Sequence, residues 1–276
     1  MKHANLIIDV GMHDGSDTAF YLAKGFEVAA VEANPQLVDA ANERFAREIA
    51  SGQLRVLPVA IAERAGTQPF AIADEMSIWS SLSPEFIKRN ETAAGTTYRY
   101  VDVRTRPFES ILEEIGVPHY LKIDIEGADM LCVRALKRMT ERPDFVSIES
   151  SVSSHHATFE AVFDELAELW SLGYRRFAYV NQRDHPKRTE PDPAREGNRA
   201  GTEFTTNHTG LFGEELPVAW ETASRAFLRA QVLRLRHNVA GYGGRWTSTP
   251  PSELYARLRS RLGGHHSWYD LHARLS

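Results

Sequence analysis

Short apolar runs alternate with segments of helical periodicity over the first 180 residues of this 276-residue chain. Such alternation is typical of a mostly parallel sheet whose strands are joined by helices. Strands are expected at residues 5–10, 27–31, 54–61, 99–103, 119–125, 144–149 and 175–180. Helices are expected at residues 16–24, 35–50, 108–115, 128–139 and 158–172. The pattern predicts an α/β fold with a Rossmann-like, doubly wound, mostly parallel sheet.

The composition changes twice after this alternating region. Residues 1–181 are expected to form the Rossmann-like domain. Polar residues, proline and glycine dominate residues 182–210, which predicts a mobile loop. Residues 211–276 predict a helical C-terminal extension, which should pack on the main domain because Trp220 and Phe227 need apolar cover. Its helical patterns cover residues 218–238 and 252–262.

Composition places the chain among soluble globular proteins, with 42% hydrophobic and 25% charged residues. No signal-peptide core follows Met1, and no apolar run is long enough to cross a bilayer. The single cysteine, Cys132, excludes an intramolecular disulfide framework. A cytoplasmic location is therefore expected, whereas the sequence leaves the oligomeric state open.

The net charge of −5 conceals an uneven distribution. From Leu216 onward, nine arginines and no lysine stand against three acidic residues. Guanidinium groups make paired hydrogen bonds to phosphate and carboxylate, so this tail suits a small-molecule acceptor that bears such a group. Attraction to the protein's own acidic part is the alternative. The acidic overall balance and the lack of an aromatic-basic repeat argue against a nucleic-acid partner.

The first predicted strand ends in a Gly-x-x-x-Gly turn at residues 11–15 that opens a helix. Gly11 allows the tight turn, and Gly15 allows the helix to approach the strand closely. The next strand ends in Glu32, where a carboxylate can accept the hydroxyls of a ribose. Asn34 follows as a helix cap and a further candidate for cofactor binding. This arrangement predicts an adenosine-containing cofactor.

The residue at position 13 indicates which cofactor it is. Dinucleotide-binding turns place a glycine there so that the backbone can approach a pyrophosphate, but this chain has His13. S-adenosylmethionine has no pyrophosphate, and Asp9, His13 and the Gly11 backbone offer hydrogen bonds to its amino-acid end. The alternative is that Asp9 and His13 only cap the turn.

A second group of polar residues lies in the strand predicted at 119–125 and just after it. Strand periodicity places Lys122, Asp124 and Glu126 on one face, although a central parallel strand is normally apolar on both faces. The crevice at the carboxyl end of such a strand is where open α/β sheets bind ligands. The alternative is a buried ion pair of Lys122 with Asp124, with Glu126 as a helix cap.

Four segments together resemble the FkbM-type methyltransferase family. They are Asp-Val-Gly-Met-His-Asp-Gly-Ser-Asp-Thr at 9–18, Val-Glu-Ala-Asn-Pro at 31–35, Leu-Lys-Ile-Asp-Ile-Glu-Gly-Ala-Asp at 121–129 and Ser-Ile-Glu at 147–149. The resemblance covers roughly residues 5–180. It implies an S-adenosylmethionine-dependent enzyme that methylates a hydroxyl of a sugar, lipid or secondary metabolite, with the glycine turn and Glu32 binding the cofactor. Met12 and His13 depart from the Ala-Asn that is frequent in the family, as does Pro-Phe-Glu at 107–109 from Thr-Leu-Asp.

Methyl transfer to a hydroxyl needs a base, and Asp124 is the first candidate. Lys122 would orient Asp124 or stabilise the developing oxyanion. His155 and His156 are the alternative bases, because a histidine titrates near neutral pH. A divalent metal is not expected, but its ligands would be Asp124, Glu126 and Glu149. Competing hypotheses are an N- or carboxylate-directed methyltransferase and a non-catalytic module that binds an adenosyl ligand.

Overall fold

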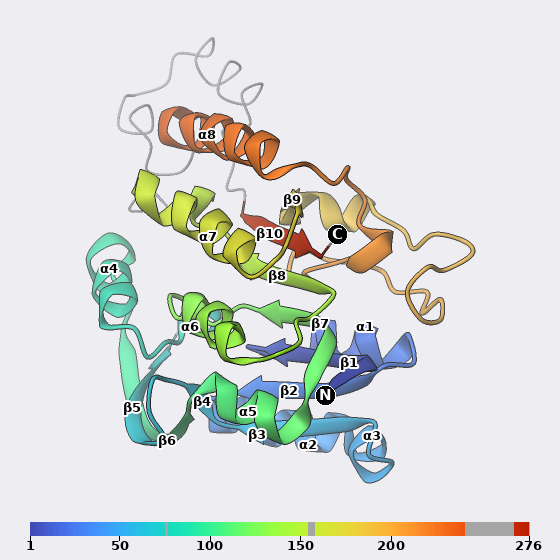
Figure 1. Cartoon of the computed structure of the whole chain (residues 1–276). Helices are drawn as coiled ribbons and strands as arrows, with labels where there is room; N and C mark the ends of the chain where they lie inside the picture. Colours follow the sequence, from blue (N-terminus) through green and yellow to red (C-terminus); the bar gives the residue numbers. More distant parts are fainter. Residues whose placement is uncertain (75–76, 154–157, 241–267, 276) are drawn as a thin grey trace. The chain divides into compact units, whose positions relative to one another are not determined.

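The computed structural model describes residues 1–74, 77–153, 158–240 and 268–275, and it divides into two compact units (Figure 1). The first unit comprises residues 1–146, 189–202 and 211–215, and the second comprises the rest. His155, His156 and the helix predicted at 252–262 lie outside the described residues.

The first unit is built on a parallel sheet in the order β3-β2-β1-β7-β8. Its strands are β1 (Lys2–Val10), β2 (Glu27–Glu32), β3 (Leu54–Pro58), β7 (Val117–Ile123) and the start of β8 (Phe145–Glu149). From β3 at the edge, the chain returns to place β7 on the other side of β1. The strand order therefore reverses between β1 and β7, and ligands of open α/β sheets bind at such a switch point. This confirms the predicted Rossmann-like fold.

The helices of this unit are α1 (Ser16–Ala23), α2 (Pro35–Arg44), α3 (Ala46–Ala50), α4 (Pro84–Ala94), α5 (Phe108–Ile115) and α6 (Asp129–Ala135). Of these, α2 and α4 begin at a side-chain cap. The Asn34 side chain accepts a hydrogen bond from the Gln36 amide at 3.1 Å and so caps α2, as expected. Ser83 caps α4 in the same way. Helix α4 has no counterpart in the sequence-based prediction.

A small second sheet follows β3 in the sequence. It consists of β4 (Ala60–Ile61), β5 (Gly66–Ala73) and β6 (Tyr98–Arg106) in the order β4-β6-β5. Ala60, Phe70, Ile72 and Val103 form its core. The strand predicted at 54–61 is thus divided between two sheets, and the one predicted at 99–103 belongs to this sheet rather than to the main one.

Two later segments of the chain belong to the first unit. Lys24 on the turn after α1 is wholly buried, and its ammonium lies 2.9 Å from a carboxylate oxygen of Glu215 and 3.5 Å from one of Glu190. Phe212 is also buried and stacks on Tyr120 of β7 at 4.5 Å. Residues 189–202 therefore make defined contacts. The division of the chain into two units does not follow the boundaries expected at residues 181 and 210.

A histidine bridge joins one of these segments to the sheet. The ring of His119 on β7 lies 2.9 Å from a carboxylate oxygen of Asp144 through Nδ1 and 2.9 Å from one of Glu196 through Nε2. Lys2 also bonds Asp144, and the ring of Phe26 stacks on that of His119. Burial acts to lower the pKa of His119, but the hydrogen bonds to the two carboxylates outweigh it and raise the pKa.

We expect His119→Gln to destabilise the protein more at pH 6 than at pH 9. A raised histidine pKa contributes stability that is present below the unfolded pKa and is lost as the pH rises through the folded pKa. Hydrogen bonds to charged groups contribute roughly 1.5–3 kcal/mol, which sets the expected loss of unfolding free energy at pH 6. Urea unfolding at both pH values measures it, with exposed His3→Gln as the control. A loss independent of pH would contradict the prediction.

The second unit contains an antiparallel strand pair and two helices. Strand β9 (Arg176–Asn181) pairs with β10 (Tyr269–Arg274), and α7 (Phe159–Ser171) and α8 (Ala223–Ala240) accompany them. Ala178, Val180 and Leu216 form an apolar cluster in it. The C-terminal extension thus contributes a strand besides its predicted helix. Among the described residues, no helix is both long and apolar enough to span a membrane.

Candidate active site

The glycine-rich turn lies at the switch point, between the carboxyl ends of β1 and β7. The amides of Gly11 and Met12 both donate to the Val31 carbonyl at the end of β2, at 3.0 and 3.1 Å. Gly11 has φ +85°, and a Cβ on it would overlap the carbonyl oxygen of Asp124. Only glycine fits at this position, because the backbone that follows β7 approaches the turn so closely.

Glu32 at the end of β2 holds the turn and the start of α2 together. One carboxylate oxygen accepts from the His13 amide at 2.8 Å, and the other accepts from the Asn34 amide at 2.8 Å. Burial raises the pKa of Glu32, although these backbone amides oppose that shift. The Ala33 amide also contributes a hydrogen bond to Glu32. The two oxygens of an ionised carboxylate have four acceptor sites in all, so Glu32 retains acceptor capacity for a ligand.

Asp9 lies beside Lys122 in the register of β1 against β7. The Asp9 side chain is fully buried, accepts from the Thr18 hydroxyl at 2.7 Å and lies 3.1 Å from the Lys122 ammonium. These contacts fix the first turn of α1 to both strands. The Asp9 side chain thus stabilises the turn through Thr18 and Lys122. Its contact with a cofactor stays a prediction.

Lys122 connects the turn to the end of β7. Its ammonium donates to the Gly11 carbonyl at 2.8 Å and lies 3.8 Å from a carboxylate oxygen of Asp124. Burial acts to lower the pKa of Lys122, but the charges of Asp9 and Asp124 outweigh it, and the pKa lies above its usual value. Lys122 is therefore a buried cation held by Asp9 and the Gly11 carbonyl beside Asp124.

The polar face predicted for the strand at 119–125 is not formed as expected. Strand β7 ends at Ile123, so Asp124 and Glu126 lie in the loop before α6. Glu126 adopts φ +48°, and its carbonyl accepts from the Ser81 hydroxyl at 2.7 Å. The left-handed backbone of Glu126 changes the direction of the chain. Lys122, Asp124 and Glu126 therefore do not lie along one continuous strand, as the prediction assumed.

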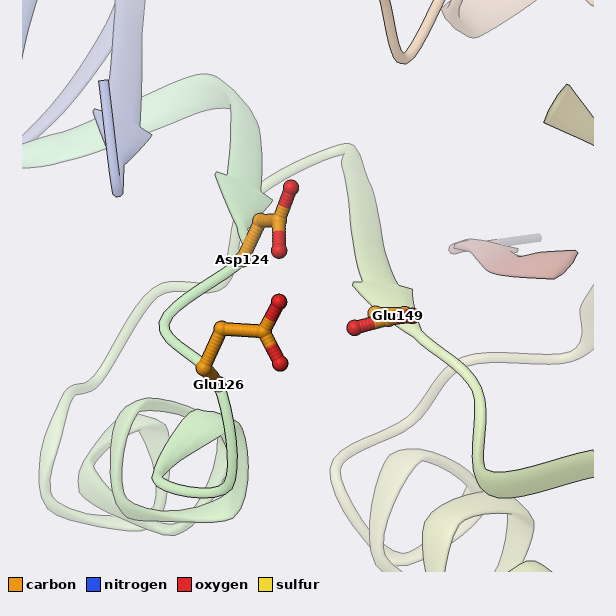
Figure 2. A group of neighbouring side chains, drawn as sticks. All are labelled: Asp124, Glu126 and Glu149. Atoms are coloured by element: carbon orange, nitrogen blue, oxygen red, sulfur yellow. The ribbon is translucent and has the colours of Figure 1, made fainter. Parts of the chain in front are cut away.

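Three carboxylates come together at the ends of β7 and β8, as Figure 2 shows. Asp124, Glu126 and Glu149 each offer one oxygen atom, and these oxygens all lie within 4.8 Å of one another. The Asp124 side chain is 39% exposed and so remains accessible from solvent. Carboxylate oxygens are the ligands that hard cations prefer, so the predicted metal ligands are adjacent.

Asp129 at the start of α6 is a residue that the sequence-based selection missed. Its carboxylate accepts from the Ile125 amide at 3.3 Å. Burial, together with the charge of Asp124, raises the pKa of Asp129 to about 6. Groups that titrate near neutrality beside a crevice are candidates for proton transfer. Its position five residues after Asp124, in the same motif, was the available signal.

Three histidines were also candidates for the site, and of these only His13 lies in the described part of the chain. His13 has φ +51° and lies in the turn, where its backbone amide serves Glu32. Burial lowers the pKa of His13, against the opposing charge of Asp14, so its ring is neutral at pH 7. His155 and His156 lie outside the described residues, and neither is placed relative to Asp124.

A sheet that reverses its order between β1 and β7, with a glycine-rich turn above that point, defines a Rossmann-like α/β protein. The model of the methyltransferase FkbM domain matches residues 9–176, which is more than half of the chain. The chain belongs to the FkbM methyltransferase family. No curated protein gives a significant match.

Several solved structures are similar at low identity. One is the methyltransferase FkbM from Methylobacillus flagellatus KT, with 16% identity, 54% of this chain and 34% of that chain covered, and a TM-score of 0.35. The match thus spans about a third of that protein's length. Precorrin-6y C5,15-methyltransferase from Geobacter metallireducens GS-15 has 12% identity, coverage of 100% and 82%, and a TM-score of 0.39. A SAM-dependent methyltransferase from Thiobacillus denitrificans, in complex with S-adenosyl-L-homocysteine, has 10% identity, coverage of 100% and 87%, and a TM-score of 0.36.

Proposed function

We propose that this chain is an S-adenosylmethionine-dependent methyltransferase that transfers the methyl group to a hydroxyl oxygen of a sugar-like, lipid or secondary-metabolite acceptor. The observation that carries the proposal is the placement of Glu32. Its buried carboxylate lies beside the glycine turn and retains acceptor capacity for a ligand. A cytoplasmic location remains a prediction from the sequence.

The described residues fit the adenosyl cofactor. Glu32 would accept the two ribose hydroxyls, and the turn with Gly11 and His13 would face the amino-acid end. His13 occupies the position where a pyrophosphate-binding turn requires glycine, which favours a cofactor without a pyrophosphate. Asn34 supports the site by capping α2 next to Glu32.

The bound cofactor supplies a methyl group on a sulfonium, and the transfer is an in-line displacement. Most of the acceleration would come from holding the acceptor oxygen opposite the sulfur. Asp124 would accept the hydroxyl proton as the acceptor oxygen bonds to the methyl carbon and the carbon–sulfur bond breaks, which leaves a neutral thioether. Lys122, fixed by Asp9 and the Gly11 carbonyl, would orient the Asp124 carboxylate.

A metal-assisted reaction is the competing mechanism. In it, Asp124, Glu126 and Glu149 would hold a divalent cation, which would supply Lewis-acid assistance to the acceptor hydroxyl. Assays after treatment with EDTA, and after return of Mg²⁺, separate the two mechanisms. Full activity in EDTA supports a side-chain base, whereas loss in EDTA and recovery with Mg²⁺ assigns the three carboxylates to the metal.

The acceptor class is open to direct measurement. Incubation with methyl-labelled S-adenosylmethionine and separate pools of hydroxyl, amine and carboxylate compounds shows which class takes up the label. Labelling of the hydroxyl pool alone supports the proposal. Labelling of amines or carboxylates would replace O-methylation with the alternative specificity, and the absence of transfer despite cofactor binding would favour a non-catalytic module.

We expect Glu32→Gln to weaken the binding of S-adenosylmethionine by about 100-fold or more. Two hydrogen bonds to a charged acceptor are worth roughly 1.5–3 kcal/mol each, and the amide retains only one acceptor oxygen. Calorimetry on the full chain measures the affinity. Exposed Glu27→Gln, at the other end of β2, is the matched control.

Circular dichroism and thermal melting must show that the Glu32 variant is folded. Unchanged affinity in a folded variant would remove Glu32 from the cofactor site. Binding of NAD by the wild-type protein would overturn the argument that was drawn from His13.

A further inference from the structure

Helices α7 and α8 of the second unit expose large apolar side chains that the proposed methyl transfer does not use. The exposed apolar side chains are Phe159, Phe163 and Trp170 on α7 and Leu228, Val232 and Leu235 on α8. Each is between 46% and 65% exposed, whereas a helix of a globular domain usually turns its apolar stripe towards the core. Single exposed apolar residues are normal, but contiguous ones mark interaction sites.

On each helix the exposed apolar residues lie along one side. They are spaced by four and seven positions in α7 and by four and three positions in α8, and such residues share a helix face. The two sets adjoin at Phe227, whose ring lies edge-on against those of Phe159 and Phe163, with ring centroids 5.6 and 6.0 Å apart. The helices lie side by side (Figure 1), and together they present one apolar surface, which we call the α7–α8 face.

The charges that flank the α7–α8 face differ in sign between the two helices. On α7, Glu160 and Asp164 are exposed next to the apolar stripe. On α8, helical periodicity places the exposed Arg225 and Arg236 on the side of the apolar stripe opposite to Phe227. The face therefore has an acidic edge on α7, an apolar middle and a basic edge on α8.

The basic edge does not depend on every arginine of α8. The helix contains four arginines and no acidic residue. Arg229 is paired with Glu221, whose two carboxylate oxygens lie 2.6 and 2.8 Å from its guanidinium nitrogens, so this pair adds no net charge. Arg225 and Arg236 supply the positive charge of the edge.

This distribution of charge favours a second copy of the chain as the partner. An anionic lipid surface would attract the basic edge but repel the acidic one. A two-fold axis through the apolar middle would place the basic edge of each copy against the acidic edge of the other, because an interface about such an axis is self-complementary. Aromatic side chains such as those on α7 are also enriched in protein interfaces.

We propose that the α7–α8 face is the interface of a homodimer. The apolar stripes of both copies lie at the centre of this interface, and the acidic and basic edges pair at its rim. The proposal does not rest on methyl transfer, because the oligomeric state is measured without S-adenosylmethionine.

Analytical ultracentrifugation of the full-length protein tests the proposal. We expect the wild type to sediment as a dimer at micromolar concentration. Val232→Glu should raise the dissociation constant of the dimer by about 100-fold or more, because a symmetric interface contains the unpaired charge twice. Ile78→Glu is the matched control, since Ile78 is an exposed aliphatic residue of the first unit, and it should leave the dimer unchanged.

A charge exchange tests the pairing of the two edges. Asp164→Arg and Arg225→Glu should each weaken the dimer by about tenfold or more, because each places like charges at the rim. The variant that carries both substitutions should recover much of the lost affinity, since the edges then exchange signs in both copies. Circular dichroism and thermal melting must show that each variant is folded.

A monomeric wild-type protein, a Val232→Glu variant that dimerises as well as the wild type, or a double variant that recovers nothing would overturn the proposal. If the wild type is monomeric, its binding to phosphatidylglycerol vesicles would assign the α7–α8 face to a lipid surface. A larger drop in melting temperature for Val232→Glu than for Ile78→Glu in a monomer would instead mean that the chain itself covers the face.

Discussion

Replacement of Asp124 by asparagine should lower turnover by about 100-fold or more while leaving the affinity for S-adenosylmethionine within about twofold. A positioned general base contributes roughly 10²–10⁴ to a rate, and asparagine keeps the shape of the side chain but cannot accept the proton. The Asp124 carboxylate is accessible to solvent and lies beside the fixed cation Lys122. Initial rates with saturating cofactor and the preferred acceptor class measure turnover, and calorimetry measures affinity.

Asp39→Asn is the control for this substitution, because Asp39 is an exposed acid on α2 away from the turn. It should change neither turnover nor affinity. Wild-type turnover in a folded Asp124 variant would eliminate Asp124 as the base. The next candidates would then be Asp129, whose pKa of about 6 suits proton transfer, and His155 and His156. Turnover that depends on Mg²⁺ would instead mark Asp124 as a metal ligand.

Replacement of Lys24 by methionine should lower the unfolding free energy by about 3–5 kcal/mol. Removal of one partner from a buried ion pair leaves the other charge uncompensated, which is far more costly than replacement of the whole pair. Glu190 and Glu215 both face Lys24, and Glu215 also accepts from the backbone amides of Arg195 and Glu196. Urea unfolding of the full chain measures the loss.

Lys88→Met is the matched control, since Lys88 is exposed on α4 and such substitutions usually change stability by less than about 0.5 kcal/mol. The triple variant with Glu190→Gln and Glu215→Gln in addition should recover part of the loss, because no uncompensated charge remains. If Lys24→Met costs no more than Lys88→Met, this ion cluster does not hold residues 189–202 and 211–215 within the first unit.

Elements with a strong periodic signal were predictable from the sequence. Helix α5 begins and ends where expected, at Phe108 and Ile115, because a proline precedes it and a glycine follows it. Strand β2 differs from the prediction by one residue, since its apolar run is bounded by charged residues on both sides. The positions of the glycine turn after β1 and of Glu32 at the end of β2 were also predictable, because a strand, a turn and a helix follow one another within a few residues.

Features that depend on distant partners were not predictable. Lys24 gives no local signal, since Glu190 and Glu215 lie 166 and 191 residues away in the sequence. Strand β10 was missed because its partner β9 lies about 90 positions earlier in the sequence. Strand β7 ends at Ile123, and the left-handed backbone of Glu126 follows three residues later, which no apolar pattern indicates.

The contact between the Gly11 turn and the Asp124 carbonyl has a consequence for sequence variation and for laboratory evolution of this protein. A side chain at position 11 would push the backbone of residue 124 aside, and the carboxylate of that residue would move with it. The two positions therefore cannot drift independently, although 113 residues separate them. Mutant libraries aimed at new acceptors should hold position 11 as glycine and place their diversity elsewhere around the carboxylate.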